Sequence, residues 1–127
     1  MMRTVYTITL FLCFMSPVFG ASAAETGSLR LAQHYSVTGT NADGSRYSGV
    51  ADVDIISHTT FSIVWHIGSG TQNGFGMRMN NTLSATYLLN GQPGLVIYRA
   101  QGDGRFTGTW AIRGESGYGT ESLSPRD

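Results

Sequence analysis

Two charged residues occupy positions at which an alternating strand would turn them toward a protein interior. If Leu95 and Ile97 face inward, Arg99 does so too, and Glu121 shares its face with Leu123. An isolated buried charge is very costly, so the two charged side chains are expected to pair. We interpret Arg99 and Glu121 as an ion pair that closes one end of a barrel, with a ligand-binding role as the alternative.

Three large aromatic side chains, Trp65, Tyr87 and Trp110, are expected on inward faces, where they would form a pocket or core with Arg99 and Glu121. An eight-stranded barrel is just wide enough either to be filled by side chains or to hold one small ligand. A filled interior is favoured by the many other inward rings: Tyr35, Tyr47, Phe61, Phe75 and Phe106. Room for a small apolar pocket is left by small inward residues: Gly49, Ala51, Ala85 and Gly108.

The sequence predicts no enzyme, no metal site and no cofactor. His34 and His66 fall on expected outer faces and His58 lies in a turn, without a tight ligand spacing. No strained turn presents a nucleophile, and the pair Glu115-Ser116 reads as part of a glycine-rich loop. The alternative is an enzyme that uses the five pocket residues.

Short alternating segments must position these side chains. Phe61, Ile63, Trp65 and Ile67 share one face of the clearest segment, and turn signals recur about every 10 to 12 residues from Leu31 onward. Similar inward faces are expected for 47–55, for 83–89, for 106–112 and, through Phe75, Met77 and Met79, for the segment between Gly70 and Asn80. The pattern predicts an all-β antiparallel meander of about eight strands, a closed up-and-down barrel, with a β-sandwich as the alternative.

Composition limits the partners and the compartment. The chain has 127 residues with zero formal net charge, and its eight basic residues are all Arg, so nothing favours nucleic acid. Residues 1–24 have the layout of a signal peptide: Arg3, an apolar run over 5–14, and small residues at 21–24. We expect a single β-barrel domain over 25–127, periplasmic or secreted, without Cys13 and with no transmembrane segment after signal cleavage.

Two stretches carry a resemblance. Residues 35–49 and the tail from Asp103-Gly104-Arg105-Phe106 through Gly119-Thr120-Glu121-Ser122-Leu123 resemble a group of short, exported, uncharacterised proteobacterial β-proteins. This resemblance implies the same fold and an envelope or extracellular location, but no activity. The triplet Gly108-Thr109-Trp110 is also similar to a motif of lipocalin- and avidin-like barrels, in which it normally lies in the first strand.

The function expected from the sequence is noncatalytic binding. The first hypothesis is a protein partner, for example through an inhibitor-like module acting in the periplasm or outside the cell. The alternatives are a carrier of a small apolar ligand and a surface adhesive protein.

Overall fold

The computed structural model describes residues 30–126. The expected signal peptide 1–24, Cys13 and the short segment 25–28 lie outside the described residues. Eight strands follow in order: β1 (His34–Thr40), β2 (Arg46–Ile55), β3 (Thr60–Ile67), β4 (Gly70–Met79), β5 (Thr82–Leu89), β6 (Gln92–Ala100), β7 (Phe106–Ile112) and β8 (Gly119–Pro125). Within residues 30–126 there is no helix of the length and apolarity needed to cross a bilayer.

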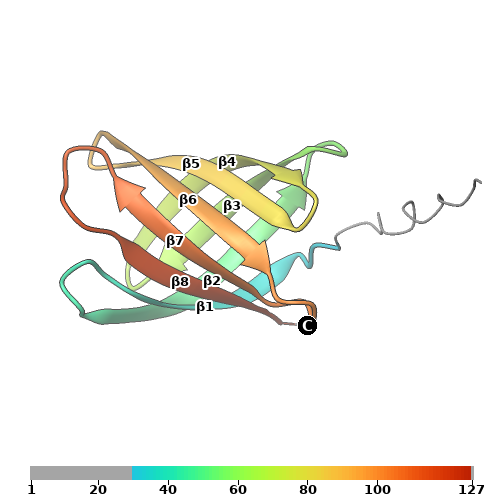
Figure 1. Cartoon of the computed structure of the whole chain (residues 1–127), viewed down its shortest axis with the longest axis horizontal. Coiled ribbons are helices and arrows are strands. Elements are labelled where there is room, and N and C mark those ends of the chain that lie inside the picture. Colours follow the sequence, from blue (N-terminus) through green and yellow to red (C-terminus); the bar gives the residue numbers. More distant parts are fainter. Residues whose placement is uncertain (1–29, 127) are drawn as a thin grey trace, which may run out of the picture.

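Each strand pairs antiparallel with the next, and β8 pairs with β1, so the sheet closes into an up-and-down barrel (Figure 1). This confirms the predicted barrel over the sandwich. Closure gives every strand two neighbours and leaves no sheet edge open to another chain. The connections are short. Three of them have only two residues, between β3 and β4, between β4 and β5, and between β5 and β6. In the last, Asn90 and Gly91 both have positive φ, the geometry that matches the twist of a two-residue hairpin.

The end of the barrel where the described chain begins and ends is filled by apolar side chains. Tyr35, Phe61, Phe106 and Leu123 are fully buried there, and Leu31 packs against them. The rings of Tyr35 and Phe106 meet edge to face at 6.1 Å. This end of the interior, which we call the terminus end, is therefore core.

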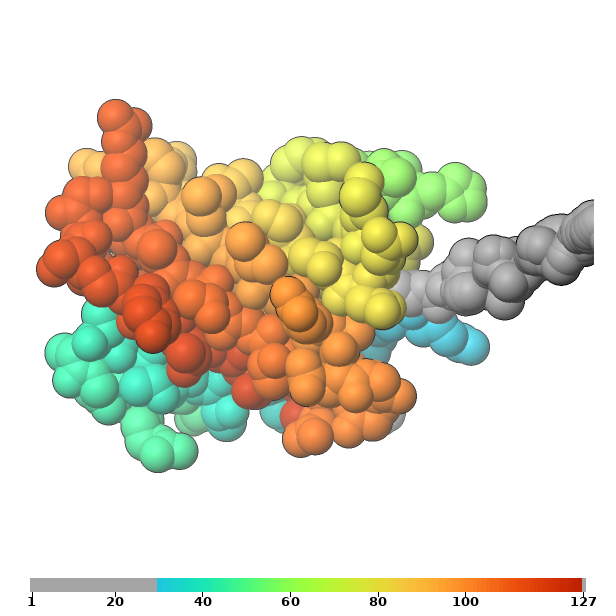
Figure 2. Space-filling model, viewed as in Figure 1, coloured from blue at the N-terminus to red at the C-terminus, as the bar shows by residue number. Residues whose placement is uncertain are grey.

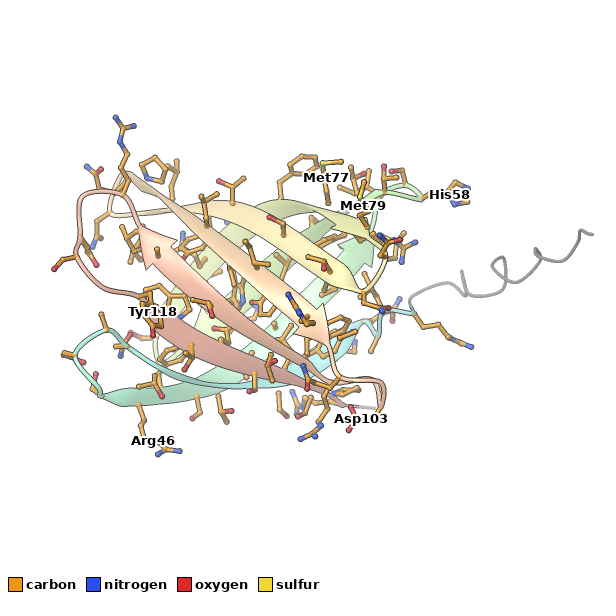
Figure 3. All side chains as sticks on the ribbon, viewed as in Figure 1. Arg46, His58, Met77, Met79, Asp103 and Tyr118 are labelled. Carbon is orange, nitrogen blue, oxygen red and sulfur yellow. The ribbon has the colours of Figure 1, made fainter. Side chains whose placement is uncertain are left out.

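The alternation assigned the correct face to most strands. The inward residues expected at 61–67, 83–87 and 106–112 do face the interior, as do Ala51 and Val53. The face expected for β4 is wrong: Phe75, Met77 and Met79 point out of the barrel with more than half of their surface exposed (Figure 3).

Glycine explains the face of β4. Gly74 and Gly76 turn inward because the rings of Trp65 and Phe61 on β3 lie over them. A Cβ at Gly76 would stand 2.5 Å from Phe61 Cζ, and one at Gly74 would stand 2.7 Å from a ring carbon of Trp65. The interior has room for the two rings only if the neighbouring strand contributes no side chain at these positions.

The same arrangement recurs around the barrel. In each of five antiparallel pairs an aromatic ring lies over the glycine directly opposite: Tyr47 over Gly39, Phe61 over Gly76, Tyr87 over Gly94, Tyr98 over Gly108 and Trp110 over Gly119. Trp65 covers Gly74 diagonally. These pairs fix which rings can enter the interior, and they direct the polar ends of several rings toward one point.

Candidate functional site

A pocket opens at the end of the barrel opposite the terminus end, and we call it the barrel pocket. The β1–β2, β3–β4 and β5–β6 hairpins lie at this end (Figure 1). The volume of the barrel pocket, about 330 Å³, lies at the lower end of the ~300–1,000 Å³ usual for small-molecule sites. The lining is mostly aromatic and aliphatic, with a few polar groups: Asn41, Tyr47, Trp65, Ile67, Gly70, Thr71, Gln72, Tyr87, Leu89, Val96, Tyr98, Trp110 and Glu121.

The pocket deepens from an exposed rim to a buried floor. Gly70 and Thr71 at the rim are exposed, and Leu89 is 37% exposed. Trp65, Val96 and Tyr98 at the floor are all buried. Trp65 and Tyr87 form an edge-to-face pair at 5.3 Å, which holds one wall of the pocket in place.

Glu121 is the buried acidic group of this floor, at 7% exposure. Glu121 lies on β8, and the residues directly opposite it on the two neighbouring strands are both glycines, Gly39 on β1 and Gly108 on β7. Beyond these glycines stand Tyr47 on β2 and Tyr98 on β6. One row of residues across five strands therefore reads Tyr, Gly, Glu, Gly, Tyr, and each tyrosine ring crosses a glycine to reach the carboxyl group.

Three side-chain donors converge on the carboxyl group. The Tyr47 hydroxyl donates to Oε1 at 2.8 Å, and the Trp65 indole N–H donates to Oε2 at 3.0 Å. The Tyr98 hydroxyl also donates to Oε2. Trp110 extends the network, since its indole N–H donates to the Tyr47 hydroxyl at 2.9 Å. Both carboxyl oxygens are thus held in fixed positions by neutral aromatic residues.

Burial sets the protonation behaviour of the floor. Desolvation raises the pKa of Glu121 above its usual value, and the hydrogen bonds from Tyr98, Tyr47 and Trp65 oppose this shift only in part. Desolvation, together with the nearby Glu121 carboxylate, raises the pKa of Tyr87 to about 12 and those of Tyr47 and Tyr98 further. The three tyrosines therefore stay neutral at physiological pH.

The structure brings together four of the five residues predicted as a pocket or core. Trp65, Tyr87, Trp110 and Glu121 all line the barrel pocket. The prediction for Arg99 is wrong: its side chain lies exposed on the outer face of β6. Hence the expected Arg99–Glu121 ion pair does not form, and aromatic donors satisfy Glu121 instead.

The prediction for Arg99 is wrong because it exchanges the inward and outward faces of β6. Val96 and Tyr98 are buried on β6, whereas Leu95 and Ile97 are 61% and 57% exposed. Both faces of this strand carry apolar residues, so hydrophobicity alone does not distinguish them. Tyr98 is therefore absent from the predicted pocket residues, although Gly108 directly opposite it is among the predicted inward small residues.

The histidines lie outside the pocket. His34 and His66 are on the outer face, as expected, and both contact Asp52, at 2.8 Å and 3.3 Å. Hydrogen bonds from the two histidines hold the pKa of Asp52 below its usual value. Among residues 30–126 no cluster of three or more His, Cys, Asp and Glu side chains is arranged to hold a metal ion.

Known structures share this fold. A redesigned β-barrel, b11L5F_LGL, is 20% identical with a TM-score of 0.60 over 76% of this chain and 92% of its own. Another redesigned barrel, mFAP1 bound to DFHBI, is 23% identical with a TM-score of 0.59 over 74% and 94% of the two chains. A mutant of the fluorescent protein UnaG is 7% identical with a TM-score of 0.51 over 76% and 96%.

At these identities the likenesses show the barrel fold alone. The similarity of Gly108-Thr109-Trp110 to a motif of lipocalin- and avidin-like barrels stays a prediction. No protein-family model and no curated protein matches the chain. The resemblance to a group of exported proteobacterial proteins stays a prediction.

Proposed function

We propose that the protein is a noncatalytic binding protein that holds one small, largely apolar or aromatic molecule in the barrel pocket. The observation that carries this proposal is a cavity of about 330 Å³ whose exposed rim leads to a buried, ring-lined floor. A barrel with a solid core would have no such space. In support, a similarly folded designed barrel is described as bound to DFHBI.

Binding without catalysis is favoured by how the polar groups of the pocket are engaged. Both oxygens of Glu121 already accept hydrogen bonds, and the tyrosine hydroxyls that donate to them stay neutral. General base catalysis needs a carboxylate free to reach a substrate proton, and nucleophilic catalysis needs an activated hydroxyl. We place this role in the periplasm or outside the cell, on the strength of the signal-like residues 1–24.

The neutral fluorescent probe N-phenyl-1-naphthylamine tests the proposal. We expect saturable one-to-one binding with a blue-shifted emission, because the dye would leave water for a pocket of aromatic side chains. Replacing Tyr87 by alanine removes one wall of the pocket and is expected to weaken binding about tenfold, the equivalent of ~1.4 kcal/mol.

Tyr118→Ala is the matched control. Tyr118 is 63% exposed in the β7–β8 connection and does not line the pocket (Figure 3). Both variants are first checked for a native near-ultraviolet circular dichroism spectrum. Absence of saturable probe binding, or equal weakening by Tyr87→Ala and Tyr118→Ala, would overturn the proposal.

A second candidate function, binding of a protein partner, rests on the outer wall of the barrel. Phe75, Met77, Met79, Leu95 and Ile97 are between 53% and 69% exposed and form what we call the outer apolar face. Three outward residues of β5 lie between them, Thr82, Ser84 and Thr86. Figure 2 shows the β5 and β6 part of this wall in yellow and orange.

The chemistry of this face defines its partner. Aromatic residues, Met and Arg are enriched where proteins meet. Met79 on β4 lies opposite Thr82 on β5, which in turn lies opposite Arg99 on β6. Arg99 is the charged residue on the outward side of these three strands. We therefore infer a partner protein that presents apolar side chains with a carboxylate beside them. A surface adhesive role stays a prediction.

A photo-crosslinking residue at position 77 tests this candidate, with one at the exposed position 36 on β1 as the control. We expect one partner that is crosslinked from position 77 alone, that rebinds one-to-one after purification, and whose affinity falls about tenfold on Arg99→Glu. A crosslink between two copies of this chain would assign the face to self-association instead. If no crosslink is specific to position 77, the outer apolar face does not bind a protein partner.

A further inference from the structure

The electrostatics of the barrel pocket specify the charge of its ligand. Glu121 is the one acidic residue among the residues that line it, and no Arg or His is among them. The ion pairs in residues 30–126 are His34–Asp52, His66–Asp52 and Arg105–Asp103, all on the surface. The floor of the pocket therefore holds a carboxyl group whose hydrogen bonds are satisfied but whose charge has no cationic counterpart.

The walls reinforce this preference. Tyr47, Trp65, Tyr87 and Trp110 line the same cavity as Glu121. The faces of aromatic rings carry negative potential and attract organic cations, including quaternary ammonium groups, most strongly where water is excluded. A carboxylate and four rings around one cavity thus favour a positive charge and disfavour a carboxylate or phosphate ligand.

We propose that the barrel pocket selects an organic cation, an apolar or aromatic molecule carrying one ammonium group, whose charge lies between Glu121 and the surrounding rings. This inference rests on the proposed small-molecule function and names the ligand class. The cation supplies the positive charge that the protein itself does not place beside Glu121, and this offsets part of the cost of burying the carboxylate. The apolar remainder of the ligand contacts the aliphatic residues of the lining, Ile67, Leu89 and Val96.

The preference should depend on pH through Glu121. The groups that face it are Tyr47, Tyr98 and, further off, Tyr87, and burial keeps all three neutral well above pH 8. Only the ionised carboxylate attracts the cation. Affinity for a cation is therefore expected to rise with pH through the titration of Glu121 and then to level off, while affinity for a neutral ligand does not rise.

Two isosteric ligands separate charge from shape. Benzyltrimethylammonium and neopentylbenzene differ by a nitrogen cation in place of a carbon atom, and each competes with N-phenyl-1-naphthylamine for the pocket. At pH 8 we expect the cation to bind about tenfold more tightly than its neutral isostere. In Glu121→Gln this ratio is expected to fall several-fold. Asp54→Asn, at an exposed acid on the outer face of β2 near the terminus end, is the control and should keep the ratio.

The wild-type protein alone also decides the question, in case Glu121→Gln does not fold. The ratio of the two affinities must fall as the pH is lowered from 8 toward 4. Equal or weaker binding of the cation at pH 8, a ratio that does not change with pH, or a ratio that survives Glu121→Gln would each overturn the inference. Failure of the naphthylamine probe to bind at all would instead overturn the proposed function.

Discussion

Gly76→Val is expected to destabilise the barrel by about 2–3 kcal/mol, a large share of the stability of a domain this size. A Cβ at this position would stand 2.5 Å from Phe61 Cζ and closer still to the carbonyl oxygen of Ser84. The ring of Phe61 is fully buried and the carbonyl belongs to the neighbouring strand, so neither can move away cheaply. Urea unfolding followed by tryptophan fluorescence measures the effect.

Gly70→Val is the matched control in the same strand. A Cβ at Gly70 would meet the Ile67 carbonyl oxygen at 3.5 Å, an ordinary contact, and the backbone there does not have positive φ. Valine favours extended backbone, so the change in unfolding free energy is expected to stay within about 0.5 kcal/mol. Equal destabilisation by the two substitutions would show that loss of glycine, rather than exclusion by Phe61, is responsible.

Glu121 should make the stability of the barrel fall as the pH rises from the acidic range. Burial raises the pKa of this carboxyl group in the folded state, so the native protein binds its proton more strongly than the unfolded chain does. Its contribution is fully present below the unfolded value of ~4.3, decreases as the pH rises through that value to the folded pKa, and is constant above it. Glu121→Gln removes this dependence because an amide does not titrate in this range.

The measured quantity is the difference in unfolding free energy between wild type and Glu121→Gln from pH 3.5 to pH 8. Asp43, Asp52 and Asp103 have lowered pKa values, so the stabilisation that they contribute decreases as the pH falls. Both proteins contain these residues, so their contributions cancel in the difference. The advantage of wild type should shrink as the pH rises. An advantage that is flat or grows with pH would contradict the raised pKa.

Glu121→Gln should also be less stable than the wild-type protein at every pH. The glutamine amide nitrogen cannot accept the hydrogen bonds that the carboxyl oxygens now accept from Tyr47, Tyr98 and Trp65. Leaving one buried donor without an acceptor costs about 1–3 kcal/mol. Tyr98→Phe tests this reason, since it removes one donor, keeps the ring and leaves the Trp65 indole N–H with Glu121 Oε2 as its acceptor. It should cost less than Glu121→Gln.

The sequence by itself determined the number of strands, their antiparallel order and most of the interior. Regular turn signals and period-two alternation predict these features, because a strand with one apolar and one polar face has a single favourable orientation. Phe61, Ile63 and Trp65 alternate with polar neighbours, so their face is unambiguous. Leu123 fixed the inward direction of Glu121 for the same reason, and the structure confirms both.

Only the tertiary structure decided the faces of β4 and β6 and, with them, the composition of the pocket. On β4 apolar residues alternate with glycines, and on β6 both faces are apolar, so local hydrophobicity predicts either no face or the wrong one. The choice is made by volume across neighbouring strands. Phe61 and Trp65 on β3 leave space on β4 only for Gly76 and Gly74, which forces Phe75 and Met77 outward.

The partners of Glu121 depend on the same long-range fit. Tyr47 and Tyr98 come from strands on either side of it, and each reaches the carboxyl group only because a glycine stands between. Such a row is defined by the register of five strands, which no short segment of the chain contains. The sequence therefore determined that a buried acid exists, whereas the packing of rings over glycines decided that aromatic donors rather than Arg99 hold it, because ring volume acts between strands and alternation acts only within one.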